Sequence, residues 1–200
     1  FAKNAVDVLK YDDNVIGLTA GGSWLTDELD GYSDLDLILV TKEKTSGNKE
    51  LMMEYANKLG NLLNAFTGEH VGDPRVLICL YDEPLVNVDI KFLTEEEFHK
   101  RVEDPFILID KDGRLEEIIA KTEAKFPTRG FQWVEDRFWT WIHYTLVKIG
   151  RGELLESYDG FAFFRDMIFG PLIHLKNGNH PRGVRRMETH IDKDDLEKIK

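Results

Sequence analysis

The sequence predicts an α+β fold, in which a mixed or antiparallel sheet with packed helices is followed by a separate C-terminal helical bundle domain. Three observations support this prediction. Apolar runs of strand length alternate with turn residues and helical patterns in the first part of the chain. The pattern changes near Phe126-Pro127, and the later residues are rich in aromatic side chains at helical spacing. We therefore expect residues 1–127 to form one domain and residues 128–200 a second, helical one.

Four strands are expected in the first domain. Residues 14–20 (NVIGLTA) indicate a strand that ends at the Gly21-Gly22 turn, and residues 34–40 (DLDLILV) indicate a second strand. Residues 76–80 (VLICL) and 85–93 (LVNVDIKFL) flank the turn YDEP, which predicts an antiparallel hairpin. The proline of that turn stays outside both runs, as a paired strand requires.

Helices are expected between and after these strands. Apolar residues recur at helical spacing over residues 48–66 and predict a helix that packs on the sheet: Leu51, Met52, Tyr55, Leu59, Leu62, Leu63 and Phe66. Thr94 followed by Glu97 is a capping-box pattern, which predicts a short helix over TEEEFHKRV. PFILID then indicates a short strand or extended segment, KDGR a turn, and residues 115–125 a further helix.

The second domain begins with a long amphipathic pattern. One apolar stripe runs from residue 131 to residue 149 and comprises Phe131, Val134, Phe138, Trp141, Ile142, Leu146 and Ile149. Gly150 and Gly152 interrupt it, and residues 160–176 predict a second helix that ends at Asn177-Gly178. The chain starts at Phe1 without a methionine and stops inside the helix-like DKDDLEKIK, so we expect the second domain to be truncated.

Composition limits the classes of partner. The net charge of −11 argues against binding to a nucleic-acid backbone, which needs a basic face, and it suits a cationic small molecule. The single cysteine, Cys79, lies in an apolar strand, cannot form an internal disulfide and is typical of a reducing cytoplasm. No signal peptide and no apolar run of membrane-spanning length are present. We expect a cytoplasmic monomer or homodimer with no nucleic-acid or membrane partner.

The strongest chemical signal is a set of three aspartates in strands. Strand side chains alternate between faces, so Asp34 and Asp36 point the same way, and Asp89 lies on the polar side of a later strand. If the two strands are neighbours, the three carboxylates converge. Like charges about 4 Å apart repel by roughly 4 kcal/mol at an effective dielectric near 20, which a bound cation relieves. Mg²⁺ suits such oxygen ligands and works with substrate phosphates, so the pattern predicts a magnesium site for phosphoryl or nucleotidyl transfer.

A phosphate-binding turn precedes these aspartates. Gly22 lets a backbone approach a ligand closely, and Ser23 offers a hydroxyl and an N–H to a phosphate. The alternative interpretation is that the aspartates face water on a half-solvated sheet, which is usual for a D-x-D motif standing alone.

The residues Gly22-Ser23, then Asp34-x-Asp36, then Asp89 on a later strand resemble the polymerase-beta-type nucleotidyltransferases. The match covers roughly residues 14 to 93. The resemblance implies a nucleotidyltransferase-like fold in which Asp34 and Asp36 hold Mg²⁺ against a nucleoside triphosphate. It also implies that Asp89 completes the metal site or activates the attacking hydroxyl, and that Gly22 and Ser23 contact phosphates.

The segment KIGRGELLESYDGFAFFRD is similar, more loosely, to the tails of small bacterial antibiotic nucleotidyltransferases, which adenylylate aminoglycosides or lincosamides. This resemblance implies ATP as co-substrate and a role in antibiotic resistance. The loop after Ser23 departs from the family pattern, because Asp27, Glu28 and Asp30 stand where many relatives carry an arginine. Phosphate contacts from that loop are therefore not expected.

Further candidates lie in the second domain. Lys148 is a candidate nucleotide-binding cation and Glu135 a candidate auxiliary base, and each is also consistent with an ordinary solvated helix. The arginines of HPRGVRR (Arg182, Arg185 and Arg186) could face a triphosphate or cap a helix. Trp133, Trp139 and Tyr144 could stack on a base or sugar, although packing is the commoner role.

The sequence thus predicts a Mg²⁺-dependent nucleotidyltransferase. It would transfer a nucleoside monophosphate, AMP from ATP, to a hydroxyl of a small molecule such as an aminoglycoside-like polycation, and release pyrophosphate. Two alternatives remain open at this point. One is a non-catalytic binding module with this fold, for instance an antitoxin partner, and the other is an enzyme that modifies a protein hydroxyl.

Overall fold

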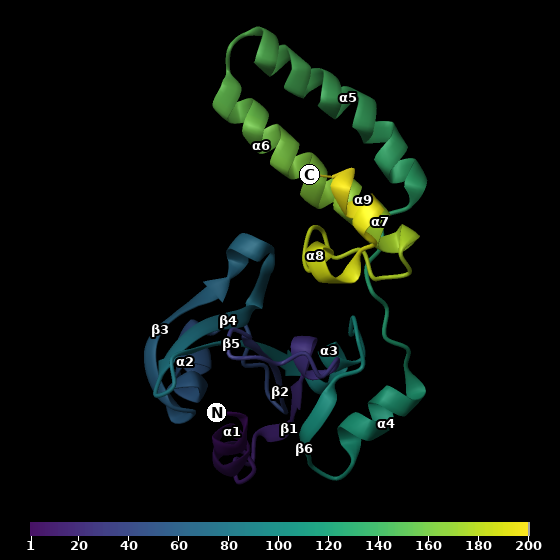
Figure 1. Cartoon of the computed structure of the whole chain (residues 1–200). Helices are drawn as coiled ribbons and strands as arrows, with labels where there is room; N and C mark the ends of the chain where they lie inside the picture. The colour runs from purple at the N-terminus through teal and green to yellow at the C-terminus, as the bar shows by residue number, and fades with distance from the viewer. Residues whose placement is uncertain (200) are drawn as a thin grey trace. The chain divides into compact units, whose positions relative to one another are not determined.

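The structure, a computed structural model, describes residues 1–199 and divides into two compact units, Phe1–Lys125 and Phe126–Lys200. Each unit is described by itself. The first unit is built on a six-stranded mixed sheet with strand order β3-β4-β5-β2-β1-β6 (Figure 1). The central strands β2 and β5 are parallel, and every other neighbouring pair is antiparallel. The strands are β1 Val15–Ala20, β2 Leu35–Thr41, β3 Asn61–Gly68, β4 Asp73–Asp82, β5 Val86–Thr94 and β6 Phe106–Asp110.

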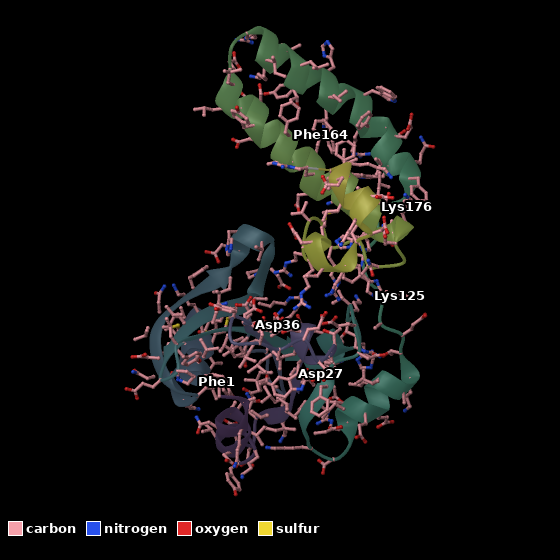
Figure 2. All side chains as sticks on the ribbon, in the orientation of Figure 1. Phe1, Asp27, Asp36, Lys125, Phe164 and Lys176 are labelled. Carbon is pink, nitrogen blue, oxygen red and sulfur yellow. The ribbon has the colours of Figure 1, made fainter. Side chains whose placement is uncertain are left out.

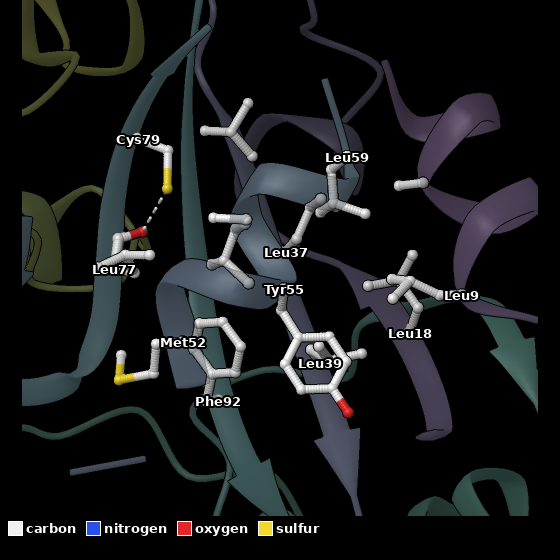
Figure 3. Close-up of a cluster of buried hydrophobic side chains, with 14 of the residues drawn as sticks. Leu9, Leu18, Leu37, Leu39, Met52, Tyr55, Leu59, Leu77, Cys79 and Phe92 are labelled. Carbon is white, nitrogen blue, oxygen red and sulfur yellow. Dashed lines mark hydrogen bonds between the residues drawn. The ribbon is translucent and has the colours of Figure 1, made fainter. Parts of the chain in front are cut away.

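Two helices cover one face of this sheet, α1 (Ala2–Leu9) and α2 (Lys49–Lys58). Alternate residues of the strands point into the core beneath them, which comprises, among others, Leu18, Leu37, Leu39, Leu77, Cys79, Val88, Ile90 and Phe92 (Figure 3). Met52, Tyr55 and Leu59 of α2 pack against these side chains. Asn48 begins α2 by accepting a hydrogen bond from the backbone N–H of Leu51.

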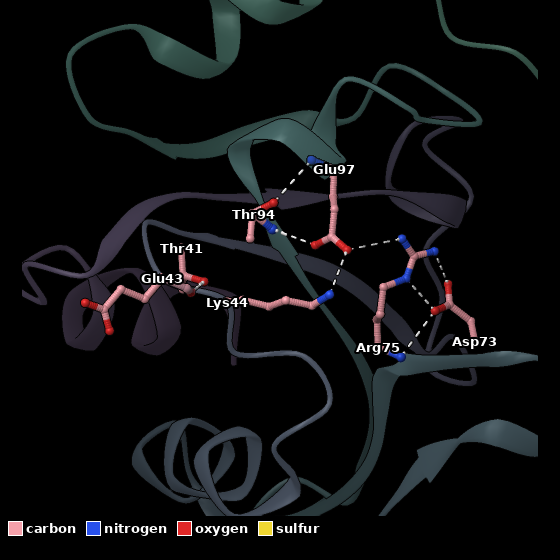
Figure 4. Close-up of polar contacts among 7 residues, drawn as sticks. All are labelled: Thr41, Glu43, Lys44, Asp73, Arg75, Thr94 and Glu97. Atoms are coloured by element: carbon pink, nitrogen blue, oxygen red, sulfur yellow. Dashed lines mark hydrogen bonds and ion pairs between the residues drawn. The ribbon is translucent and has the colours of Figure 1, made fainter.

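The opposite face of the sheet is covered at one end. α3 (Glu95–Phe98) and α4 (Arg114–Lys121) supply Phe98, Leu115 and Ile118 to a second apolar cluster with Val40 and Leu93. Thr94 and Glu97 form the expected capping box at the start of α3 (Figure 4). This second cluster covers only one end of the face. The candidate site lies on the uncovered part.

One expected helix is too long. The helix predicted over residues 48–66 ends at Lys58, and Asn61–Gly68 form the edge strand β3, paired antiparallel with β4. Gly60 separates the two elements. The spacing of Leu59, Leu62 and Phe66 imitates a helix, but backbone pairing with β4 overrides that local preference. The structure also contains α1, which was not predicted from the sequence.

The second unit contains the helices α5 (Phe131–Gly150), α6 (Leu154–Phe164), α7 (Gly170–Lys176), α8 (Met187–His190) and α9 (Lys193–Glu197) (Figure 1). The helix expected over residues 160–176 starts earlier, at Leu154, and a π-helical segment, Arg165–Phe169, interrupts it. The long helix expected from residue 131 is present as α5 and ends at Gly150. Over residues 1–199, none of the helices combines the length and the apolar character needed to cross a membrane.

Candidate active site

Asp36 and Asp89 are register partners on the central parallel strands. Asp36 on β2 lies opposite Asp89 on β5, so the two side chains share a face of the sheet, the face away from the α1–α2 core. Asp34 immediately precedes β2 and is two residues from Asp36, which directs it to the same side. The condition set by the sequence, that the two aspartate strands be neighbours, is met. Figure 2 labels Asp36 on the sheet.

The sequences of β2 and β5 explain why no helix covers the sheet face at Asp36 and Asp89. Along β2 the same side carries Asp36 and then Val40, and along β5 it carries Asp89 and then Leu93. The later, apolar residues belong to the cluster beneath α3 and α4. The carboxylates therefore lie beyond the edge of this helical cover, where Asp36 is exposed and Asp89 is half-buried.

The glycine turn packs directly against Asp36. The backbone N–H of Gly21 donates to the carbonyl of Asp36 at 2.9 Å and extends the β1–β2 pairing. Gly22 has φ +60°, and a Cβ atom built on it would lie 2.1 Å from Oδ2 of Asp36. Glycine is favoured at this position, because a residue with a Cβ atom would be strained in this backbone conformation and would require the Asp36 carboxylate to move. Ser23 follows in a 3₁₀ turn, Gly22–Trp24, and is half-exposed.

A fourth carboxylate occupies the turn. Oε1 of Glu103, from the loop before β6, accepts a hydrogen bond from the backbone N–H of Gly22 at 2.9 Å. The sequence predicts phosphate contacts at Gly22 and at the hydroxyl and N–H of Ser23, and in the structure the Gly22 N–H binds this carboxylate. The turn thus lies between two carboxylates, that of Asp36 and that of Glu103. A carboxylate on this donor indicates that the turn accepts an anionic oxygen.

Asp89 has polar neighbours along its own strand. Nδ2 of Asn87 donates to Oδ1 of Asp89 at 3.2 Å, and Asn87 lies two residues away on the same side. Lys91, two residues after Asp89 on β5, forms an ion pair with Asp73 at 2.8 Å. Asn87 therefore helps to orient the Asp89 carboxylate.

Asp73 also belongs to a network of ion pairs with Arg75, Glu97 and Lys44 (Figure 4). Arg75 binds Asp73 at 2.7 Å and lies 4.0 Å from Glu97, which Lys44 also approaches at 3.9 Å. The hydrogen bonds from Arg75 and then from Lys91 hold the pKa of Asp73 well below its ordinary value. These pairs fix the charged border of the site.

An open hollow of about 480 Å³ adjoins Asp34. It lies between residues 31–34 of the loop before β2 and residues 85–87 at the start of β5, with Leu80 at its wall. Asp34 and Asn87 both line it. Its size falls within the range of small-molecule sites, which links the aspartate end of the sheet to a space for a ligand.

The donor chemistry of this end of the sheet fits a hard cation. Carboxylate oxygens are the ligands that Mg²⁺ prefers, and Asp36 and Asp89 are adjacent on paired strands. Within residues 1–199, no three His, Cys, Asp or Glu side chains gather closely enough to hold a metal ion. The three-carboxylate set of Asp34, Asp36 and Asp89 therefore stays a prediction, and the register pair is its observed part.

Lys148 lies on α5 in the second unit, where it is already paired. Its ammonium group is 2.7 Å from Glu153 and 2.9 Å from Glu156, and it lies over the Tyr144 ring. The hydrogen bonds from Glu153 and Glu156 raise the pKa of Lys148. These contacts connect α5 to the start of α6, and a nucleotide-binding role for Lys148 stays a prediction.

The other candidates of the second unit also make local contacts. Glu135 accepts a hydrogen bond from Nε1 of Trp139 at 3.1 Å. Trp133 lies beneath the guanidinium groups of Arg129 and Arg137, at 4.5 and 4.3 Å from its ring centre. The guanidinium group of Arg182 lies 5.5 Å from the ring centre of Phe126. A stacking role for Trp133, Trp139 and Tyr144 stays a prediction.

Two residues of the site were not identified from the sequence. Glu103 is separated from Gly22 by 81 positions and lies in a loop, so no local pattern connects the two. The sequence places Asn87 on the polar side of its strand but indicates no role for it. Cys79, by contrast, is buried in the core as expected, and burial raises the pKa of its thiol to about 12.

The fold and the site together define an α+β protein whose central parallel strands present paired aspartates beside a glycine turn. No protein-family model matches the chain, and no curated protein matches it either. Solved structures similar to it include that of a nucleotidyltransferase-like protein from Exiguobacterium sibiricum 255-15, at a TM-score of 0.42 and 13% sequence identity. That alignment covers 98% of this chain and 64% of the other protein, so this chain spans less than two thirds of its length.

Proposed function

We propose that this protein is a Mg²⁺-dependent nucleotidyltransferase. It transfers a nucleoside monophosphate, AMP from ATP, to a hydroxyl group of a small molecule and releases pyrophosphate. One observation supports the proposal above all others. Asp36 and Asp89 are register partners on adjacent strands, next to a turn whose backbone conformation at Gly22 favours glycine.

The reaction forms one bond and breaks one. The acceptor hydroxyl oxygen attacks the α-phosphorus, the bond from that phosphorus to the pyrophosphate oxygen breaks, and pyrophosphate leaves. Asp89 takes the hydroxyl proton, and the hydrogen bond from Asn87 holds its carboxylate in one orientation. Asp34 and Asp36 bind the metal ion, which when bound neutralises charge on the triphosphate.

The glycine turn positions the phosphates. The backbone N–H of Gly22 and the hydroxyl of Ser23 are the donors we assign to phosphate oxygens. Glu103 holds the Gly22 N–H at 2.9 Å, so its carboxylate leaves this donor when a phosphate binds. Exchange of one anionic oxygen for another keeps the N–H satisfied throughout.

An aminoglycoside-like polycation is the acceptor we propose. The chain carries a net charge of −11, and Asp27, Glu28 and Asp30 lie in the loop before β2. Acidic surfaces attract cationic ligands and raise their local concentration. This acceptor implies a cytoplasmic enzyme of antibiotic resistance.

The test is direct. The purified chain is incubated with Mg²⁺, labelled ATP or GTP, and a panel of aminoglycosides and lincosamides, and pyrophosphate release and label transfer are measured. Activity that Asp36→Asn abolishes and Asp13→Asn leaves unchanged supports the proposal, since Asp13 is an exposed aspartate outside the site. Turnover retained in the Asp36→Asn variant removes it.

A non-catalytic binding module is the second candidate, and the Glu103–Gly22 hydrogen bond favours it. A carboxylate on the phosphate donor is also what a turn that no longer binds nucleotides would contain. Calorimetric titration with ATP separates the two. Mg²⁺-dependent binding supports the enzyme, and no binding in the wild type and in Glu103→Ala supports the module.

A further inference from the structure

The helices α5 and α6 form an antiparallel hairpin with a well-defined inner contact. Phe138 and Trp141 of α5 meet Phe164 and Phe163 of α6 with ring centres 5.9 and 5.0 Å apart. A Cβ atom on Gly160 would come within 2.8 Å of the Thr145 hydroxyl, so the helices approach closely there. Figure 2 labels Phe164 between the two helices.

One side of the hairpin is closed by polar contacts. The Tyr144 hydroxyl donates to Glu156, and Lys148 binds Glu153 and Glu156. These residues fix the rotation of both helices about their axes. On each helix, residues on one side of the inner contact make these polar contacts. Residues on the other side of the inner contact therefore lie on the opposite side of the hairpin.

That opposite side is apolar on both helices. On α5 it carries Trp139, Ile142, Leu146 and Ile149, spaced by three and four residues, and on α6 it carries Leu154, Tyr158 and Phe161, also spaced by four and three. At about 100° per residue each set forms one stripe, and because the helices are antiparallel the two stripes lie side by side. We call these seven residues the hairpin face.

The hairpin face is exposed. The exposed fractions are 65% for Trp139, 57% for Leu146 and 71% for Tyr158, and Ile149, Leu154 and Phe161 are also more than 40% exposed. Monomeric soluble proteins rarely expose a contiguous apolar patch this rich in aromatic side chains. Such patches mark interaction sites, and Trp and Tyr are the usual anchors of protein interfaces.

We propose that the hairpin face is a homodimer interface, in which the hairpins of two copies of this chain pack face to face. The hairpin face extends over residues 139–149 of α5, about 16 Å, and two helices side by side cover roughly 20 Å, so the face measures about 300 Å² in projection. A standard interface buries about 800 Å² of each partner. The hairpin face supplies the apolar centre of such an interface, and the residues around it supply the remainder.

The charged residues at the ends of the two stripes suit a second copy of this chain. Most surfaces of a chain with a net charge of −11 repel their own copy. The stripes of the hairpin face continue by one turn to a single acid, Glu135 on α5, and a single base, Arg165, which directly follows α6. A twofold axis along the hairpin lays α5 of one copy over α6 of the other, which brings Glu135 to Arg165 twice.

The experiment measures oligomeric state by sedimentation equilibrium on the full chain. The wild type is expected to be dimeric at tens of micromolar. Leu146→Glu and Tyr158→Glu raise the dissociation constant at least about thirtyfold, because each buries a charge at the centre of the interface. Val147→Glu is the matched control, since Val147 is a neighbouring exposed apolar residue on another side of α5.

Circular dichroism verifies that each variant keeps its helices. Glu135→Arg and Arg165→Glu are each expected to weaken the dimer, and their combination is expected to restore it. A wild type that is monomeric throughout the concentration range overturns the proposal, and so does equal dissociation of the Leu146 and Val147 variants. Because no nucleotide enters the measurement, the result is independent of the proposed enzyme activity.

Discussion

Gly22 lies directly against the carboxylate of Asp36, so that a Cβ atom at position 22 would lie 2.1 Å from Oδ2 of the aspartate. The backbone at Gly22 also has φ +60°, a conformation that L-residues rarely adopt. The glycine turn and strand β2 therefore pack closely at Asp36. A substitution at Gly22 is expected to displace the Asp36 side chain.

Gly22→Ala is therefore expected to damage both stability and activity. The left-handed backbone costs about 1–2 kcal/mol for alanine, and the contact with Asp36 adds to this. Urea unfolding measures the loss of stability and pyrophosphate release the loss of turnover. Gly31→Ala in the same loop is the control, because an added Cβ would meet nothing within 4 Å there. Equal stability of the two variants contradicts the expectation.

Asp36→Asn and Asp89→Asn are expected to separate two roles. Each variant keeps the shape of the side chain, so the melting temperature should change little for these exposed or half-buried positions. Asp36→Asn should reduce both Mg²⁺-dependent nucleotide binding and turnover. Asp89→Asn should lower kcat by about a hundredfold or more while nucleotide affinity changes much less, since its role is toward the acceptor hydroxyl.

Single-turnover kinetics together with calorimetry measure these quantities. If Asp89→Asn loses nucleotide affinity to the same extent as Asp36→Asn, both residues act on the metal ion and Asp89 is not the proton acceptor. If neither variant loses turnover, the register pair has no catalytic role.

Under the proposed function, Glu103 and a phosphate group use the same Gly22 N–H, so removal of Glu103 is expected to strengthen phosphate binding. Glu103→Ala frees the donor and removes a negative charge, and binding of ATP or of inorganic tripolyphosphate should tighten by about tenfold. Glu96→Gln, at an exposed position on α3, should leave affinity unchanged. Weaker binding in Glu103→Ala would instead identify Glu103 as part of the ligand site.

The sequence indicates β1, β2 and the β4–β5 hairpin because alternating apolar residues and turn residues are local signals. The same alternation directs Asp36 and Asp89 to the polar side of their strands. Their adjacency depends on the parallel pairing of β2 with β5, which no local pattern encodes. For the same reason β3 was mistaken for a helix, since its pairing with β4 determines its conformation. Glu103 reaches Gly22 through the packing of a distant loop and has no signature at all.

Asp73 gives a prediction about stability and pH. Its carboxylate binds Arg75 and Lys91, is 22% exposed, and has a pKa lowered from 3.8 in the folded state. A carboxylate whose pKa is lowered by folding stabilises the native state fully above its unfolded pKa. That contribution is lost as the pH falls through the folded pKa. Asp73→Asn should therefore lose about 1–2 kcal/mol at neutral pH.

The difference between the wild type and Asp73→Asn should begin to shrink as the pH falls below the unfolded pKa of about 4, and it should vanish only below the lowered folded pKa, where position 73 is neutral in both proteins. Urea unfolding at a series of pH values from neutral to acidic measures this difference directly. Asp13→Asn, at an exposed position outside the network, should show little difference at any pH. A constant difference across the acidic range would mean that the hydrogen bonds of Asp73, rather than its charge, stabilise the border of the site.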